Sequence, residues 1–228
     1  MGPVGICRRG TSIVIAAMAA VSLLIAPAVT PGSSRTIATA QAACPDIEVV
    51  FARGRKEAAG AGQIGYAFVD ALRARTKRNV SLYAVQYPAD NEVDIGANDM
   101  SRHVAGTMAN CPDTRIVLGG YSLGAAVTDV VLAVPMPFFT FKNPLPAGAE
   151  QHIAAVALFG NGMSWVGPIT TFSPVYRDRT IELCHGDDPI CNPTDPENWQ
   201  SYWPDHLAPA YIKAGMANQA ADFVAARV

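Results

Sequence analysis

Short apolar runs alternate along this chain with segments in which apolar residues recur every three or four positions. The runs have the length of β-strands, and the repeating segments have the spacing of one face of an α-helix. Strands are therefore predicted at residues 47–52, 81–85, 115–118, 153–159 and 180–183. Helices are predicted at 62–77, 94–109, 122–132 and 208–227, and the proline-rich stretches 135–146 and 189–204 are interpreted as surface loops.

The predicted strands are apolar at nearly every position, so both of their faces are expected to be buried. Strands of that kind are typical of a parallel sheet with helices on each side, and the alternation of strands with helices favours the same arrangement. We therefore predict an α/β protein, a three-layer α/β/α sandwich with a central parallel sheet of about five strands. In the helix predicted at 94–109, the side chains of Ile95, Val104 and Met108 are expected to face the sheet.

The first part of the chain does not follow this alternation. Arg8 and Arg9 precede an apolar run at 13–29, and small residues at 38–42 offer a cleavage site. That order is typical of a secretory signal peptide, and the run is short for a membrane-spanning helix, although an uncleaved membrane anchor is the alternative. We expect cleavage that releases residues 43–228 as one secreted domain, extracellular or associated with the cell envelope.

The charge balance argues against a nucleic-acid partner. The chain carries a formal net charge of −2, and the expected signal peptide contains three arginines and no acidic residue. Its removal changes the net charge to −5 and leaves no run of basic residues. A mildly acidic chain gives no reason to expect nucleic acid or an anionic membrane as a partner.

The cysteines predict two disulfides. Cys7 would leave with the signal peptide, and the four that remain are expected to pair in an oxidising compartment. Of the three possible pairings, the simplest joins the nearby Cys184 and Cys191 and leaves Cys44 to pair with Cys111. No CxxC or HExxH spacing occurs, so no metal site is predicted.

A GxSxG sequence lies at residues 120–124, where a predicted strand runs directly into a predicted helix. In α/β-hydrolases this strand-to-helix turn carries the nucleophilic serine. Glycines on either side let the strand and the helix pack closely, and the helix N-terminus directs backbone N–H groups to the point where negative charge develops. Ser122 is therefore the candidate nucleophile, and a serine that caps an ordinary helix is the alternative.

A serine nucleophile needs a base, and the base needs an orienting acid. In α/β-hydrolases the acid and then the histidine follow the serine along the chain. His206 satisfies that order, on a predicted loop before the last helix that can fold back over the carboxyl edge of the sheet. The acid is expected in the segment 184–191, which follows the fifth strand and would be closed by a disulfide. On these grounds Asp187 and Asp188 are nearly equal candidates.

Several segments in this order resemble the cutinase family, most of all the cutinase-like proteins of mycobacteria. They are CPDIEVVFARG at 44–54, GGYS at 119–122, DPIC at 188–191 and the segment from His206 to the C-terminus. The resemblance covers residues 44–228 and implies a small α/β-hydrolase without a lid, metal or organic cofactor. It also implies Ser122 as the nucleophile, His206 as the base and Asp188 as the acid. The disulfides that it implies are Cys44–Cys111 and Cys184–Cys191. In the family the acid lies four residues after the first cysteine of the loop.

The resemblance also implies an oxyanion hole at Arg55 and Leu123, and both residues depart from the family pattern. Family members commonly have Ser or Thr at the first position and Gln at the second. Backbone N–H donors survive either substitution, but the side-chain donors are missing, and one lost donor can lower turnover by about 10²–10³. We therefore expect a slower or differently selective esterase than typical members. Asp187, where the family often has Gly or a small polar residue, is another departure.

We expect a monomeric serine esterase that cleaves short- to medium-chain carboxylic esters through an acyl-enzyme. Trp199, Tyr202 and Trp203 lie between the candidate acid and the candidate base, so they are expected to flank the site. An exposed aromatic rim would suit acyl chains or transient contact with lipid surfaces, and aromatic side chains that cover the core are an equal alternative. One alternative is an acetylxylan esterase on the same fold. The other is a secreted binding protein on a degenerate hydrolase scaffold, which the altered oxyanion positions favour and the retained serine, acid and histidine oppose.

Overall fold

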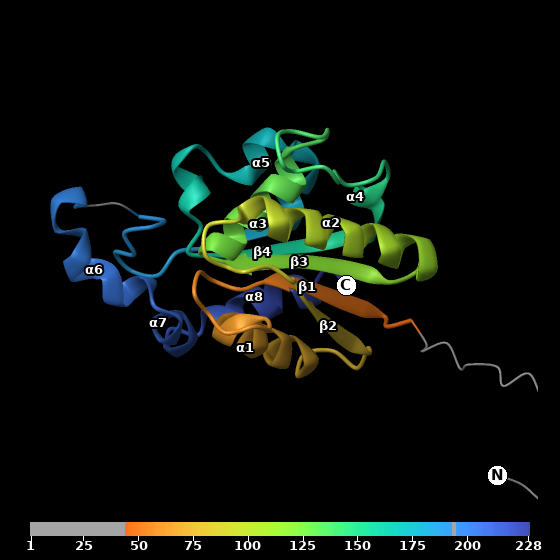
Figure 1. Ribbon diagram of the computed structural model, residues 1–228. Helices are drawn as coiled ribbons and strands as arrows, with labels where there is room; N and C mark the ends of the chain where they lie inside the picture. Colours follow the sequence, from red (N-terminus) through yellow and green to blue (C-terminus); the bar gives the residue numbers. More distant parts are fainter. Residues whose placement is uncertain (1–43, 193–194) are drawn as a thin grey trace, which may run out of the picture. The chain divides into compact units, whose positions relative to one another are not determined.

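The computed structural model describes residues 44–192 and 195–228, and the expected signal peptide lies outside them (Figure 1). The described residues contain a parallel sheet with the strand order β2-β1-β3-β4-β5. The strands are β1 (Ile47–Ala52), β2 (Val80–Ala84), β3 (Arg115–Tyr121), β4 (Ile153–Phe159) and β5 (Thr180–Leu183). The five predicted strands are thus confirmed, and β3 continues beyond its expected end into the GxSxG segment.

Helices cover both faces of the sheet, which confirms the three-layer sandwich (Figure 1). One face carries α1 (Gly62–Arg73), α7 (Ala208–Lys213) and α8 (Met216–Ala225), and the other carries α2 (Val93–Asn110) and α3 (Leu123–Ala133). Shorter helical segments occupy the second half of the chain. They are α4 (Ala149–His152), η1 (Gly162–Trp165), α5 (Ile169–Phe172), η2 (Pro174–Arg179), η3 (Pro196–Asn198) and α6 (Trp199–His206), of which the η segments are 3₁₀ helices.

Alternate side chains of each strand enter two apolar cores on opposite faces of the sheet. Val49 and Phe51 of β1 pack with α1 and α8, whereas Val50 and Ala52 pack with α2 and α3. Successive side chains of a strand point to opposite faces, so an unbroken apolar strand such as β4, buried at every position, has to be covered on both sides. This packing brings the carboxyl ends of the parallel neighbours β3, β4 and β5 to one edge of the sheet.

Two disulfides have the predicted pairing. Cys44, just before β1, is bonded to Cys111 at the end of α2, and Cys184 is bonded to Cys191 across the loop that follows β5. The first crosslink spans 67 residues. A crosslink of that span can stabilise a fold by up to about 4 kcal/mol because it restricts the unfolded chain. Within the described residues, no helix combines the length and the apolar sequence needed to cross a membrane.

Three details of the helix predictions were wrong. The segment 208–227 forms two helices, because Gly215 adopts a left-handed conformation (φ 75°) between α7 and α8. Helix α1 ends at Arg73, earlier than expected, where its buried face ends. Ile95 is 43% exposed and does not face the sheet. It precedes the buried Val104 by nine positions, about two and a half helical turns, so the two side chains point in opposite directions.

The proline-rich stretch 189–204 is not simply a surface loop, because it contains η3 and most of α6. Pro196 occupies the first turn of η3, where a missing N–H removes no helical hydrogen bond. Pro204 lies close to the end of α6. Pro196 therefore occupies a position that a short helix tolerates, whereas Pro204 lies inside α6 and removes the hydrogen bond that an N–H there would donate to the Gln200 carbonyl. Figure 1 shows α6 beyond the carboxyl ends of the strands, the edge at which the candidate catalytic residues lie.

Candidate active site

A strained turn between β3 and α3 holds Ser122. Its φ of 54° and ψ of −117° are unusual for a residue with a side chain, and backbone strain of this kind is concentrated at functional sites. Close packing around the turn requires both glycines of the motif. A Cβ on Gly120 would lie 2.1 Å from the carbonyl oxygen of Gly124, and a Cβ on Gly124 would lie 2.0 Å from that of Ala52. The GxSxG segment therefore forms the strand-to-helix turn that its position predicts.

Ser122, His206 and Asp188 form one hydrogen-bonded chain. The Ser122 Oγ lies 2.8 Å from His206 Nε2, and His206 Nδ1 lies 2.7 Å from Asp188 Oδ2. Asp188 is fully buried and His206 is 3% exposed, so little water competes for the bond between them. The structure thus brings together three residues that the sequence analysis singled out, although His206 is the last residue of α6 and does not lie on a loop.

The carboxylate of Asp188 accepts two hydrogen bonds besides the one from His206. The Tyr211 hydroxyl donates to Oδ2 at 2.5 Å, and the Ile190 N–H donates to Oδ1 at 2.7 Å. Burial by itself raises the pKa of Asp188, but the hydrogen bonds from His206, Tyr211 and Ile190 and the charge of His206 outweigh it, so this pKa lies below its ordinary value. The carboxylate is therefore ionised at neutral pH, the state in which it can orient an imidazole.

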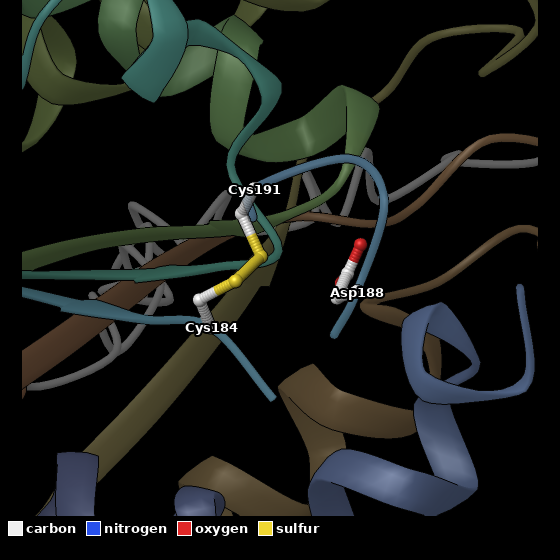
Figure 2. A group of neighbouring side chains, drawn as sticks. All are labelled: Cys184, Asp188 and Cys191. Atoms are coloured by element: carbon white, nitrogen blue, oxygen red, sulfur yellow. A yellow bond between two sulfur atoms is a disulfide. The ribbon is translucent and has the colours of Figure 1, made fainter. Parts of the chain in front are cut away.

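A small disulfide loop carries this carboxylate. Figure 2 shows the Cys184–Cys191 bond joining the ends of the loop, with Asp188 on the turn between them. Asp187, the alternative acid, is exposed, and its backbone N–H donates to Asp205 Oδ2 at 3.0 Å. The loop therefore brings the carboxylate of Asp188, and not that of Asp187, to the histidine.

Two tyrosines that the sequence analysis did not identify support the histidine and the acid. The Tyr121 hydroxyl donates to the backbone carbonyl of His206, as the Tyr211 hydroxyl does to Asp188. Burial raises the pKa of both hydroxyls, and the bond to Asp188 raises that of Tyr211 further, so both remain protonated donors at neutral pH. A Cβ on Gly160 would lie 3.0 Å from the Tyr211 oxygen and 3.2 Å from Asp188 Oδ2, so glycine leaves the space that this contact needs.

A cleft of about 770 Å³ is lined by Ser122 and His206. Apolar side chains make up much of its wall, and they include those of Leu123, Ala126, Met163, Ile190, Trp203 and Leu207. Of the three aromatic residues expected to flank the site, Trp203 lines this cleft and Trp199 lines a neighbouring pocket, whereas Tyr202 lines neither. The serine hydroxyl is therefore accessible from a space that suits the hydrocarbon part of a ligand.

The cutinase family model matches residues 43–228 of this chain. The chain belongs to the cutinase family. A relative within it, the probable carboxylesterase Culp2 of Mycobacterium tuberculosis (strain ATCC 25618 / H37Rv), is 63% identical over 214 residues, which are 93% of either chain. The phospholipase Culp4 of the same strain is 46% identical over 228 residues, covering 98% of this chain and 94% of the relative. Family and relatives together make this protein a carboxylic ester hydrolase.

Solved structures of other proteins have the same fold as this chain. The Trichoderma reesei cutinase in complex with a phosphonate inhibitor superposes with a TM-score of 0.60 at 28% identity, covering 79% of this chain and 75% of that one. The catalytic core domain of the acetyl xylan esterase from Trichoderma reesei superposes with a TM-score of 0.64 at 24% identity, covering 82% of this chain and 100% of that one. The second likeness is one of fold alone.

The two departures from the cutinase-family pattern lie at the rim of the catalytic cleft. Arg55 and Leu123 line it together with Ser122. Leu123 is the first residue of α3, so its N–H has no carbonyl partner within the helix. The loop that carries Arg55 is fixed by the next residue, since the Lys56 N–H donates to the Ala89 carbonyl at 2.7 Å. Neither side chain supplies the hydroxyl or the carboxamide that is common in the family.

Glu57, which the sequence analysis did not identify, holds this same loop in place. Its carboxylate accepts hydrogen bonds from the Gly54 N–H at 2.6 Å and from the Gln63 N–H at 2.9 Å. A Cβ on Gly62 would approach a carboxylate oxygen to 2.2 Å, so glycine provides the space for the contact. Glu57 thereby joins the two ends of the loop that carries Arg55 to the cleft.

One cluster of metal-ligating residue types occurs within the described part of this cutinase-family chain, and it belongs to the same loop. Cys184, Asp188 and Cys191 bring their ligand atoms within 4.8 Å of one another. The two sulfurs are bonded to each other, and the carboxylate is hydrogen-bonded to His206. A disulfide offers no thiolate to a metal ion, so this cluster does not fit one.

A buried acid on α3 is incompletely paired. The Asn161 amide donates to Asp129 Oδ2 at 2.8 Å, but Oδ1 has no hydrogen-bond partner among the described residues. Burial raises the pKa of Asp129 to about 7 with a contribution from the charge of Glu182, although the Asn161 bond opposes the shift. Asn161 also accepts from the Met163 N–H at 3.0 Å, so this acid is linked to the segment η1 at the wall of the cleft.

Asp129→Asn is expected to stabilise the protein more at pH 8 than at pH 5. The native state keeps the Asp129 proton up to about pH 7, whereas the unfolded chain releases it near pH 4, so the wild-type free energy of unfolding falls as the pH rises between these values. Between pH 5 and pH 8 the native state alone holds this proton over about two pH units, which corresponds to a loss of about 3 kcal/mol that a neutral amide avoids. Denaturant unfolding at both pH values measures the effect, with the exposed Asp113→Asn as the control. The same change in stability at both pH values would contradict this expectation.

Proposed function

We propose that this protein is a secreted serine esterase that cleaves short- to medium-chain carboxylic esters through an acyl-enzyme on Ser122. The observation that carries the proposal is the hydrogen-bonded chain from Ser122 through His206 to Asp188 at the wall of an apolar cleft. A serine hydroxyl becomes a strong nucleophile when a neighbouring base takes its proton, and an acid that orients the base makes this transfer efficient. The two contacts of His206 supply both conditions.

In the first half of the reaction, the Ser122 Oγ attacks the carbonyl carbon of the ester while its proton passes to His206 Nε2. Asp188 holds the ring through Nδ1 and stabilises the imidazolium that forms. The carbonyl oxygen becomes negatively charged, and the backbone N–H groups of Leu123 and Arg55 are the donors proposed to bind it. His206 then protonates the oxygen of the leaving alcohol as the C–O bond breaks, which leaves the acyl group on Ser122.

The second half repeats these steps with water. His206 removes a proton from a water molecule as its oxygen attacks the acyl-enzyme, and the same N–H donors stabilise the second tetrahedral intermediate. Collapse of that intermediate releases the carboxylic acid and returns the proton to Ser122 Oγ. The reaction consumes one water per ester and restores the enzyme.

The apolar wall of the cleft supports substrates with hydrocarbon acyl groups over acetylated sugars. The relatives named above, a probable carboxylesterase and a phospholipase, also support lipid-like esters. The proposal also includes secretion, because the signal-like N-terminal segment and the two disulfides favour an oxidising compartment. We propose that the secreted protein is a monomer. The exposed side chains of Trp203 and Leu207 beside the cleft would make transient contacts with lipid surfaces.

A fluorophosphonate probe tests the proposal directly, and stoichiometric labelling of Ser122 is expected because an activated serine attacks phosphorus as it attacks a carbonyl. Intact-mass measurement and peptide mapping locate the label. Rates on p-nitrophenyl butyrate and octanoate, compared with acetate release from acetylated xylan, separate this esterase from an acetylxylan esterase. A folded protein without a label on Ser122 would instead be a binding protein on a hydrolase scaffold.

The double variant Arg55→Thr, Leu123→Gln is expected to raise kcat on p-nitrophenyl butyrate. It restores the hydroxyl and the carboxamide that the family commonly has beside the oxyanion, where a single donor is worth about 10²–10³ in turnover. A gain of about ten-fold is expected, because a donor contributes fully only when it lies about 2.7–3.1 Å from the oxyanion, which a substitution alone does not ensure. The exposed Arg78→Thr serves as the control. Unchanged kcat in the double variant would count against the idea that these two positions limit the rate.

A further inference from the structure

A second pocket adjoins the catalytic cleft. It has a volume of about 670 Å³, and its apolar lining comes from Pro189, Ile190, Pro196, Trp199 and Trp203. Arg55, Ile190 and Trp203 line both cavities, so the pocket and the cleft meet along these three side chains. A largely apolar cavity of this size with a few polar groups is typical of a site for a small molecule. The hydrolytic steps proposed above leave it unused.

Helix α6 leads from this pocket to the catalytic base. Trp199, Trp203 and His206 are spaced by four and three residues, so they lie in a row along one face of the helix. The two indole rings pack edge to face at 5.7 Å, and the Trp203 ring lies 5.0 Å from the His206 ring. Despite these contacts Trp199 is 44% exposed and Trp203 is 38% exposed. An apolar surface therefore runs from His206, the base that takes the proton of Ser122, into the second pocket.

The polar groups of the pocket are arranged unevenly. Arg55 lies where the two cavities meet. It forms an ion pair with Asp90 at 3.5 Å, and both side chains are half-exposed. Such a surface pair contributes little to stability, so Arg55 can exchange it for a contact with a ligand. Asp195, the other charged lining residue, accepts hydrogen bonds from Asn198. A ligand that spans both cavities would thus place hydrocarbon in each of them and a polar centre beside Arg55.

We propose that the second pocket binds a second hydrocarbon chain of the substrate, so that two-chain esters such as diacylglycerolipids are preferred. The acyl chain to be cleaved lies in the catalytic cleft, and the chain that stays on the alcohol lies against Trp199 and Trp203. Hydrolysis consumes one water and releases one fatty acid and the monoacyl lipid. The inference rests on the proposed function, because it needs Ser122 as the nucleophile.

Two phosphatidylcholines of matched structure test the proposal. Dihexanoylphosphatidylcholine and hexanoyl lysophosphatidylcholine share the headgroup and the hexanoyl ester, and they differ in the second chain. Each methylene moved from water to apolar surroundings changes affinity about four-fold, so partial burial of one chain predicts a kcat/KM at least about ten-fold higher for the two-chain lipid. Both lipids are used below the concentrations at which they form micelles. Equal kcat/KM values, or a preference seen only with micelles or vesicles, would overturn the proposal.

Two variants change the pocket outside the catalytic cleft. Gln200→Trp fills it and Trp199→Ala removes part of its wall, and each is expected to lower the ratio of the two kcat/KM values several-fold toward one. Phe139→Ala is the matched control, because Phe139 is an aromatic residue that is 78% exposed and lines neither cavity. If both pocket variants keep the wild-type ratio, the second chain does not bind there.

Fluorophosphonate labelling and p-nitrophenyl butyrate hydrolysis, run on the same preparations, test the esterase activity separately from the second-chain site. A protein that labels at Ser122 and cleaves butyrate but treats the two lipids alike contradicts the second-chain site and leaves the esterase intact. A folded protein that neither labels nor cleaves butyrate contradicts both. Labelling also shows that each pocket variant has kept its active-site fold.

Discussion

Ser122→Ala is expected to lower kcat on p-nitrophenyl butyrate by about 10⁶, close to the limit at which the remaining activity can be detected. The substitution removes the oxygen that lies 2.8 Å from His206 Nε2 and with it the acyl-enzyme route. What remains is attack by water with help from the histidine and the oxyanion donors, which in serine hydrolases is worth about 10³–10⁴ over the uncatalysed reaction.

The control for this substitution is Ser201→Ala, on the exposed side of α6, which also carries His206. It is expected to keep kcat within about two-fold, because surface substitutions of this kind rarely disturb a fold. Burst kinetics and mass spectrometry of the trapped acyl group complete the test. If the Ser122→Ala protein kept even a hundredth of the wild-type kcat, another nucleophile would have to be sought.

The sheet could be predicted from the sequence because each of its strands is encoded locally. The bounds of β1, β4 and β5 agree with the predicted ones to the residue, since burial on both faces produces an unbroken apolar run with polar ends. Helices at the edges of the fold were harder to predict. Gly215 interrupts an apolar pattern that continues on both sides of it. The prolines in and beside α6 are typical of a loop, and the position of this helix depends on the loop it packs against.

The candidate site also contains both residues that the sequence could predict and residues that it could not. Ser122 could be predicted because a GxSxG turn between a strand and a helix is a local feature. Asp188 and Asp187 could not be separated from the residues alone, and the structure adds the reason: the loop turns one carboxylate inward and leaves the other exposed. Tyr211 and Glu57 had no local signal, because a tyrosine in a helix and a glutamate in a loop are common. Their contacts with the site exist only in the folded chain.

Asp188→Asn is expected to lower kcat by about 10⁴, because an amide cannot satisfy the three donors that surround this side chain. His206 Nδ1 and the Tyr211 hydroxyl both point at Oδ2, and the Ile190 N–H points at Oδ1. With its oxygen toward His206, the amide would set its NH₂ group against the Ile190 N–H. In the opposite orientation the NH₂ donates to Nδ1, which moves the ring proton to Nε2 and leaves no lone pair there to accept the serine proton.

Asp187→Asn provides the matched comparison, since it makes the same chemical change one residue away. Its side chain is exposed, and the backbone N–H that bonds to Asp205 is retained, so kcat is expected to change by less than about three-fold. Measuring kcat and thermal unfolding for both variants separates lost catalysis from lost stability. A large loss in Asp187→Asn, or a wild-type rate in a folded Asp188→Asn, would mean that the carboxylate hydrogen-bonded to His206 is not the one that orients it during the reaction.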